Sequence, residues 1–141
     1  MSEPASRGEP LVLRGLDEVR ASAGTELGPT DWVEITRERL DAWASACPGA
    51  PTGYLLLSLT NLFMPEMVRV EDVSAGLNVG TGSVHLPPDD VPAGTRVRAR
   101  GAITSVEEAR GGVQTVIHIE VEADTAPHPL LEVDAVSRWL D

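Results

Sequence analysis

Hydrophobic residues change their spacing about halfway along the chain. Residues 52–64 are apolar on nearly every side of a helix, and a helix without a polar face has to be enclosed by other parts of the protein. From residue 77 onward apolar and polar residues alternate instead, which predicts four strands over residues 77–86, 96–106, 113–124 and 130–140. One face of the third strand is expected to be buried, with the residues Val113, Thr115, Ile117, Ile119 and Val121.

Glycine and proline mark the boundaries between these segments. Gly111-Gly112 predicts a hairpin between the second and third strands, and Pro65 is expected to end the apolar helix. One enclosed helix and one antiparallel sheet predict an α+β fold, with the sheet wrapped around the helix. A single domain is therefore expected over residues 13–141, preceded by a disordered N-terminal tail over residues 1–12 that is rich in Ser, Glu, Pro and Gly.

Shorter elements are predicted before the apolar helix. Residues 13–22 favour a helix and residues 31–35 a strand. Thr36 is the expected N-cap of another helix, because a threonine hydroxyl accepts a hydrogen bond from an unpaired backbone N–H of the first turn. This helix ends at Pro48-Gly49, and its spacing predicts one apolar stripe made of Leu40, Trp43, Ala44 and Cys47.

Composition excludes several classes of function. The 141 residues carry a net charge of -11 and contain no lysine, which excludes a Schiff-base lysine and a P-loop lysine and argues against a nucleic-acid partner. Cys47 is the single cysteine, so neither an intrachain disulfide nor a cysteine zinc cluster is expected. No segment has the length of a membrane span or the apolar core of a signal peptide, so a cytoplasmic protein without a membrane partner is expected.

The start of the apolar helix resembles part of a known catalytic motif. In the MaoC-like (R-specific enoyl-CoA hydratase/dehydratase) hot-dog family, a buried helix opens with a His-Gly pair that a Ser-Leu pair follows. Gly53, Ser58 and Leu59 keep this spacing, and Thr52 stands in the place of the histidine. The resemblance implies a single hot-dog domain, in agreement with the fold expected from the alternation of the strands.

A second segment of the chain also resembles this family, which has an Asn-x-Gly and then a basic-Val-basic-Phe-Pro pattern. The matching residues are Asn78, Gly80, Val84 and Pro87. Ser83 and His85 stand in the places of the two positive charges. Upstream of the helix the family carries a loop with an Asp and a His that add or remove water across an acyl-thioester double bond. Here only residues 48–51 join the two helices, and that loop has no counterpart.

The candidate site is placed at the start of the apolar helix. Unpaired backbone N–H groups at a helix start favour negative charge, so the Gly53 N–H is the expected donor to a thioester carbonyl if the chain binds one. The expected substrate-binding residues are Thr52, Gly53, Tyr54, Ser58, Asn78 and Cys47. No catalytic residue, metal site or cofactor is predicted.

Four of these residues are also given a purely structural interpretation. Gly53 fits close packing at the helix start, Thr52 an N-cap, Ser58 a hydrogen bond to the preceding turn, and Cys47 a buried thiol. For Thr52 and Cys47 the structural interpretation is favoured.

Charged residues alternate on the solvent-facing side of the predicted sheet. Arg96, Arg98 and Arg100 follow one strand, and they are expected to pair with acidic residues of the neighbouring strands, Glu120, Glu122, Glu132 and Asp134. His118 alternates onto the same face.

Together these observations predict a divergent MaoC-like protein that binds an acyl or polyketide-type intermediate. Its reaction, if there is one, would be a dehydration, cyclisation or isomerisation with few acid/base groups. The alternative is a catalytically silent hot-dog subunit that pairs with an active hydratase. A homodimer or a heterodimer with another hot-dog subunit is expected, because such sheets pair along their exposed edges.

Overall fold

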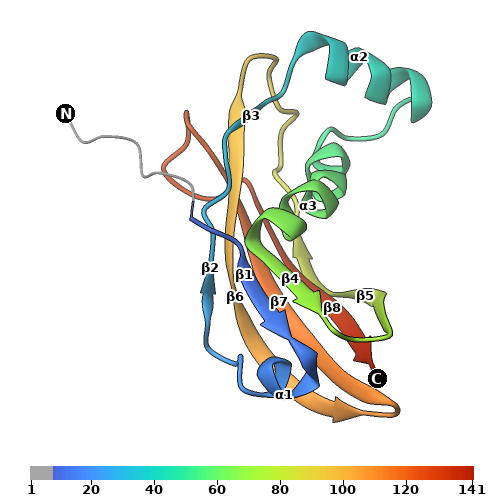
Figure 1. Cartoon of the computed structure of the whole chain (residues 1–141). Coiled ribbons are helices and arrows are strands. Elements are labelled where there is room, and N and C mark those ends of the chain that lie inside the picture. Colours follow the sequence, from blue (N-terminus) through green and yellow to red (C-terminus); the bar gives the residue numbers. More distant parts are fainter. Residues whose placement is uncertain (1–7) are drawn as a thin grey trace, which may run out of the picture.

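A long, twisted antiparallel sheet forms the body of the protein in the computed structural model, which describes residues 8–141 (Figure 1). The strands lie in the order β2-β6-β7-β8-β5, and β3 also pairs with β6. Their bounds are β2 (Glu26–Leu27), β3 (Val33–Glu34), β5 (Ala75–His85), β6 (Arg96–Ala109), β7 (Gly112–Ala123) and β8 (Leu131–Leu140). The four long strands therefore confirm the alternation read from the sequence.

The middle strand of this sheet supplies much of the hydrophobic core. The tight turn before β7 contains Gly111, whose φ of 79° lies in the left-handed region that glycine adopts without steric cost. Along β7, the residues of the predicted inner face, Val113, Thr115, Ile117, Ile119 and Val121, are all buried. The two-residue period thus assigned the faces of this strand correctly.

The apolar helix α3 (Gly53–Met67) packs against the inner face of the sheet. Leu56, Phe63 and Met67 are completely buried along one side of the helix. The opposite side is open, because the sheet covers α3 from one direction only: the exposed fractions are 48% for Tyr54 and 50% for Leu62. The expectation that the helix is enclosed on all sides is therefore wrong for the single chain.

Pro65 lies inside α3, which was expected to end there. A proline within a helix removes one backbone donor. The helix nevertheless continues for two residues, and the Val68 N–H still donates to the Met64 carbonyl. Pro65 lies in the last turn, so few hydrogen bonds depend on its position.

A small two-stranded sheet lies beside the main one. β1 (Leu11–Arg14) pairs in parallel with β4 (Val68–Glu71), directly after α3, and α1 (Gly15–Arg20) follows β1. The helix expected over residues 13–22 therefore begins later, because its first two residues belong to β1. Leu11 and Val12 also belong to this strand rather than to the expected tail, of which residues 1–7 lie outside the described part.

Helix α2 (Arg37–Ala46) lies beyond the end of the main sheet (Figure 1). The predicted cap is confirmed, since the Arg39 N–H donates to the Thr36 hydroxyl at 3.1 Å. Of the predicted apolar stripe, Leu40 is buried, whereas Ala44 is exposed. None of the helices within residues 8–141 is long and apolar enough to cross a membrane.

Candidate functional site

A pocket of about 480 Å³ lies between the open side of α3 and the sheet edge formed by β5 and β8. We call it the α3–β8 pocket. Its lining comes from α3 (Tyr54, Leu57, Ser58, Thr60, Asn61, Met64 and Pro65), from β5 (Gly76, Leu77, Asn78 and Thr81) and from β8 (Val133, Ala135, Ser137 and Trp139). Apolar side chains predominate, with hydroxyl and amide groups among them, as is usual for sites that bind small molecules.

Half of the residues predicted from the sequence line this pocket. Tyr54, Ser58 and Asn78 do, and they come from two elements that are distant in the sequence but face each other across the cavity. The other three, Thr52, Gly53 and Cys47, are not among its lining residues. The candidate site is therefore displaced along α3, away from the helix start and toward its middle.

Thr52 connects the start of α3 to the loop before β6. Its hydroxyl accepts a hydrogen bond from the Val91 N–H at 2.7 Å, and both its hydroxyl and its N–H donate to Asp90 Oδ1 at 3.3 Å. The side chain makes no capping hydrogen bond to α3. Thr52 therefore occupies the expected N-cap position without a capping hydrogen bond, and its hydroxyl links two segments instead.

Gly53 is buried against the segment that follows β5. A β-carbon at this position would lie 3.1 Å from Pro87 Cδ and 3.3 Å from Leu86 Cβ, closer than most real contacts. The next two N–H groups are already used, since Tyr54 donates to the Pro51 carbonyl and Leu55 to the Thr52 carbonyl. These contacts favour the packing interpretation of Gly53. The helix start offers fewer free donors than the sequence suggested because a tight turn precedes it.

Cys47 follows the last residue of α2, and its backbone N–H donates to the Trp43 carbonyl. Its thiol is partly exposed rather than buried. Cys47 is not among the residues that line the α3–β8 pocket with Tyr54 and Ser58, and α2 lies away from the sheet in Figure 1. The partial exposure also contradicts the buried structural thiol that was the favoured interpretation.

Two of the side chains in the α3–β8 pocket have defined hydrogen bonds. The Ser58 hydroxyl donates to the Leu55 carbonyl at 2.7 Å, so its remaining capacity toward a ligand is that of an acceptor. The Trp139 indole N–H donates to the Thr115 hydroxyl at 3.1 Å, which holds the ring against the cavity. Trp139 and Ser137 were not among the site residues predicted from the sequence, although both lie on the same face of β8.

No carboxylate, imidazole, thiol or guanidinium lines this pocket among the residues that the structure describes. Its one titratable group is the Tyr54 phenol. Adding or removing water next to a thioester needs a positioned base and a positioned acid. The pocket therefore offers a surface for binding without the usual acid/base pair.

The opposite face of the sheet carries the charged residues. Arg98 and Arg100 both pair with Glu122, at 2.5 and 3.2 Å, as the sequence predicted, whereas Arg96 lies over the Trp32 ring at 5.4 Å. His118 Nδ1 lies 2.8 Å from Asp134 Oδ1. This hydrogen bond is the main reason why the pKa of His118 is raised, and the nearby charges of Asp134, Glu120 and Glu132 contribute in the same direction while partial burial opposes them.

Comparisons with known proteins agree with the observed architecture. No protein-family model matches the chain. A solved MaoC-like dehydratase from Rhodospirillum rubrum superimposes with a TM-score of 0.62 over 85% of this chain and 94% of its own, at 8% identity. The chain has the hot-dog fold of the MaoC-like proteins. A monoamine oxidase regulatory protein from an archaeon of the genus Archaeoglobus has the same fold, with a TM-score of 0.67 at 11% identity over 94% of this chain and 99% of its own.

A sequence relative extends over nearly the whole chain. The 3-hydroxyacyl-thioester dehydratase Z of Mycobacterium tuberculosis is 28% identical over 149 aligned residues, which cover 92% of this chain and 98% of the relative. The protein of the same name from Mycobacterium bovis matches equally well. The chain is thus similar in sequence to a dehydratase, whereas no acid/base side chain is among the described residues that line its α3–β8 pocket.

Proposed function

We propose that this MaoC-like protein binds an acyl thioester or a polyketide-type intermediate, with the acyl part in the α3–β8 pocket. The observation that supports the proposal most is the cavity of about 480 Å³, which has apolar walls and a few hydroxyl and amide groups. Apolar walls suit an acyl chain, and hydroxyl and amide groups suit its oxygen atoms. The similarity to a 3-hydroxyacyl-thioester dehydratase supports the same class of ligand.

The reaction, if there is one, would be a dehydration, cyclisation or isomerisation that needs little acid/base assistance. A hydroxyl such as that of Ser58 is a poor general base, and no carboxylate or imidazole is among the described residues that line the pocket. Losing a positioned acid or base typically lowers a rate by roughly 100- to 10,000-fold. We therefore expect the purified protein to turn over crotonyl-CoA and 3-hydroxybutyryl-CoA far more slowly than an intact hydratase.

Binding can be followed with Trp139, because its indole lines the pocket. Titration with crotonyl-CoA and with longer 3-hydroxyacyl-CoA esters should change the tryptophan fluorescence, and Trp139→Phe should remove most of this change. Trp43→Phe is the control, since Trp43 belongs to α2 and does not line the pocket. A signal that persists in Trp139→Phe and disappears in Trp43→Phe would place the ligand elsewhere.

A pair of matched substitutions tests the location independently of fluorescence. Ala135→Leu, on β8, fills the α3–β8 pocket and should weaken thioester binding at least tenfold, as measured by calorimetry. Ala102→Leu makes the same change on the opposite face of the sheet, at a residue that lines a different pocket, and should leave binding unchanged. Equal effects of the two variants would contradict the proposed site.

A second function, that of a silent subunit beside an active hot-dog partner, is supported by the exposed apolar residues. These large side chains, Tyr54, Leu62, Leu77 and Val79, all belong to α3 and to the edge strand β5. An exposed strand edge with apolar side chains favours pairing with another chain. We expect a homodimer, or a heterodimer of the same geometry.

Light scattering at micromolar concentration, followed by mixing with an active MaoC-like hydratase, distinguishes these states. A heterodimer that gains activity would favour the silent-subunit function. A homodimer that binds thioesters would favour the first proposal. A chain that is monomeric, alone and in the mixture, would contradict the expected assembly.

A further inference from the structure

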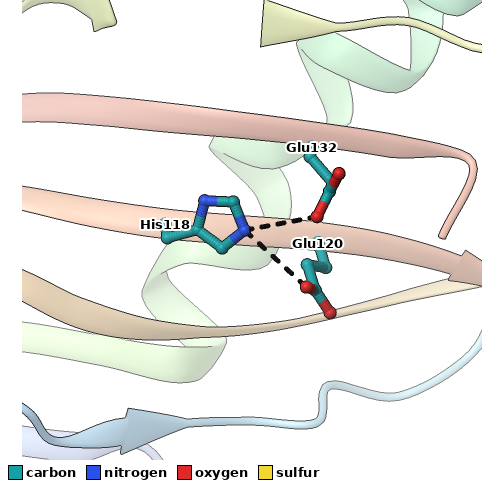
Figure 2. Close-up of side chains that lie close together, drawn as sticks. All are labelled: His118, Glu120 and Glu132. Atoms are coloured by element: carbon teal, nitrogen blue, oxygen red, sulfur yellow. Dashed lines mark ion pairs between the residues drawn. The ribbon is translucent and has the colours of Figure 1, made fainter. Parts of the chain in front are cut away.

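A second group of polar side chains lies on the sheet face opposite the α3–β8 pocket. His118 and Glu120 are two residues apart on β7 and therefore share a face, and Glu132 lies directly opposite Glu120 on β8. Figure 2 shows the His118 imidazole pointing toward both carboxylates. We call these three residues the His-Glu-Glu cluster. The side chains are one-third to two-fifths exposed, so ions have access to them.

The spacing within the cluster fits an ion better than direct contacts. His118 Nε2 lies 3.7 Å from Glu120 Oε1 and 3.5 Å from Glu132 Oε1. Both distances exceed the roughly 2.7–3.2 Å of a hydrogen bond from nitrogen to oxygen. Ligand atoms held about 2.0–2.1 Å from a tetrahedral zinc ion are separated by roughly 3.4 Å, which is close to the observed spacing.

The orientation of His118 is fixed by a fourth residue. Asp134 lies directly opposite His118 on β8, and its Oδ1 is 2.8 Å from His118 Nδ1. A carboxylate accepts, so Nδ1 carries the hydrogen and the lone pair of a neutral imidazole lies on Nε2, toward the two glutamates. Metal-binding histidines commonly have such a carboxylate behind them, because it fixes the tautomer and makes the ring more basic.

The charges around the cluster are unbalanced without a cation. Glu120 and Glu132 are directly opposed on neighbouring strands, an arrangement that is destabilising for like charges. The nearest basic residue across from Glu120 is Arg100 on β6, and its guanidinium pairs with Glu122. Among residues 8–141, His118 is the one ion-pair partner found for either glutamate. A divalent cation between the three side chains would remove this repulsion.

A cavity adjoins the cluster. His118, Glu120 and Arg100 are among the residues that line a pocket of about 390 Å³ on this face of the sheet. Three protein ligands leave at least one coordination position for water or a small ligand, as in catalytic rather than structural zinc sites. The pocket gives that position access to solvent.

We propose that His118, Glu120 and Glu132 bind a divalent transition-metal ion of the zinc type, with Asp134 orienting the histidine. An imidazole ligand favours such ions over Mg²⁺ and Ca²⁺, which prefer all-oxygen sites. The site is separated from the thioester pocket by the sheet, so it does not depend on the proposed function of that pocket.

Calorimetry with Zn²⁺ and the full chain, after treatment with EDTA and dialysis, tests the proposal. One ion should bind per chain with a dissociation constant in the micromolar range or below. His118→Ala should weaken binding more than 100-fold, Glu120→Gln and Glu132→Gln at least tenfold each, and Asp134→Asn roughly 10- to 100-fold through loss of orientation. The glutamine variants keep the size of the side chain, and circular dichroism confirms that each variant is folded.

His128→Ala is the matched control, because His128 is an exposed histidine in the turn between β7 and β8 and does not belong to the cluster, whereas His85 lies directly opposite Glu132. It should leave the affinity for Zn²⁺ unchanged. Addition of Co²⁺ should give a visible absorption spectrum of low coordination number that His118→Ala abolishes. The proposal is overturned if Zn²⁺ binds only at millimolar concentration, if His118→Ala binds it as well as the natural chain, or if His128→Ala removes it.

Discussion

Thr52 is expected to stabilise the fold rather than to take part in chemistry, although it occupies the position of the family's histidine. Thr52→Val keeps the shape of the side chain and removes the hydroxyl. The Val91 N–H then loses the acceptor that lies 2.7 Å away, in a residue that is only 5% exposed. A buried donor left without a partner costs about 1–3 kcal/mol. The accompanying contact to Asp90 is longer and exposed, so it adds little.

The change can be measured as the free energy of unfolding in urea or as a melting temperature. For a domain of this size about 1 kcal/mol corresponds to roughly 3–4 °C, so the melting temperature should fall by roughly 3–12 °C. Thr52→Ser keeps the hydroxyl and should lose less than about 0.5 kcal/mol. Binding of crotonyl-CoA should be unchanged in folded Thr52→Val, because Thr52 does not line the α3–β8 pocket.

Thr60→Val provides a matched control within the same helix. The Thr60 hydroxyl donates to the Leu57 carbonyl of the preceding turn, and no buried donor depends on it. This substitution should cost about 0–0.5 kcal/mol. If Thr52→Val and Thr60→Val unfold alike, the link between α3 and the loop before β6 contributes nothing. If Thr52→Val stays stable but loses thioester binding, the residue belongs to the site after all.

Two further predictions concern α3 and the His-Glu-Glu cluster. Phe63→Ala should lower the free energy of unfolding by about 3–5 kcal/mol, because Phe63 is fully buried. Leu62→Ala should have little effect on the stability of the isolated chain, because Leu62 is exposed. If urea titrations give equal losses of stability for the two variants, the assignment of the core is wrong. The raised pKa of His118 means that its charged form is stabilised in the folded state, so its contribution is full below pH 6.5 and is lost as the pH rises through the folded pKa. In EDTA, His118→Gln should therefore be destabilised relative to the natural chain most strongly below pH 6.5, and a difference that grows with rising pH would refute this sign.

The sheet could be predicted from the sequence because strand alternation fixes which side chains face the core. Val113 to Val121 alternate without interruption, and a shift by one residue would bury His118 and Glu120 instead of Ile117 and Ile119. The small β1–β4 sheet could not be predicted in this way. It pairs segments more than fifty residues apart, and β1 has only four residues, too few for a clear period.

Only half of the site residues predicted from the sequence line the pocket, because the contacts of the others depend on segments that are distant in the sequence. The family resemblance identified Ser58 and Asn78, and Tyr54 was placed by its position at the start of α3. The pairing of Thr52 with Val91 depends on tertiary contacts. The His-Glu-Glu cluster shows the same limit. Alternation places His118 and Glu120 on the outer face of β7, whereas the register between β7 and β8 brings Glu132 beside them. No local pattern in the sequence carries that register.

The two faces of the sheet carry different kinds of polar side chain. The inner side has the hot-dog pocket, where the walls are apolar and no acidic or basic side chain is found among the lining residues. The outer side has a histidine with three carboxylates within reach, next to a second cavity. Without its usual acid/base loop, a hot-dog scaffold can still select an acyl chain by shape, because apolar burial needs no titratable group. Whether a chemical step follows then depends on groups from outside the α3–β8 pocket, which a partner chain at the exposed α3–β5 side could supply.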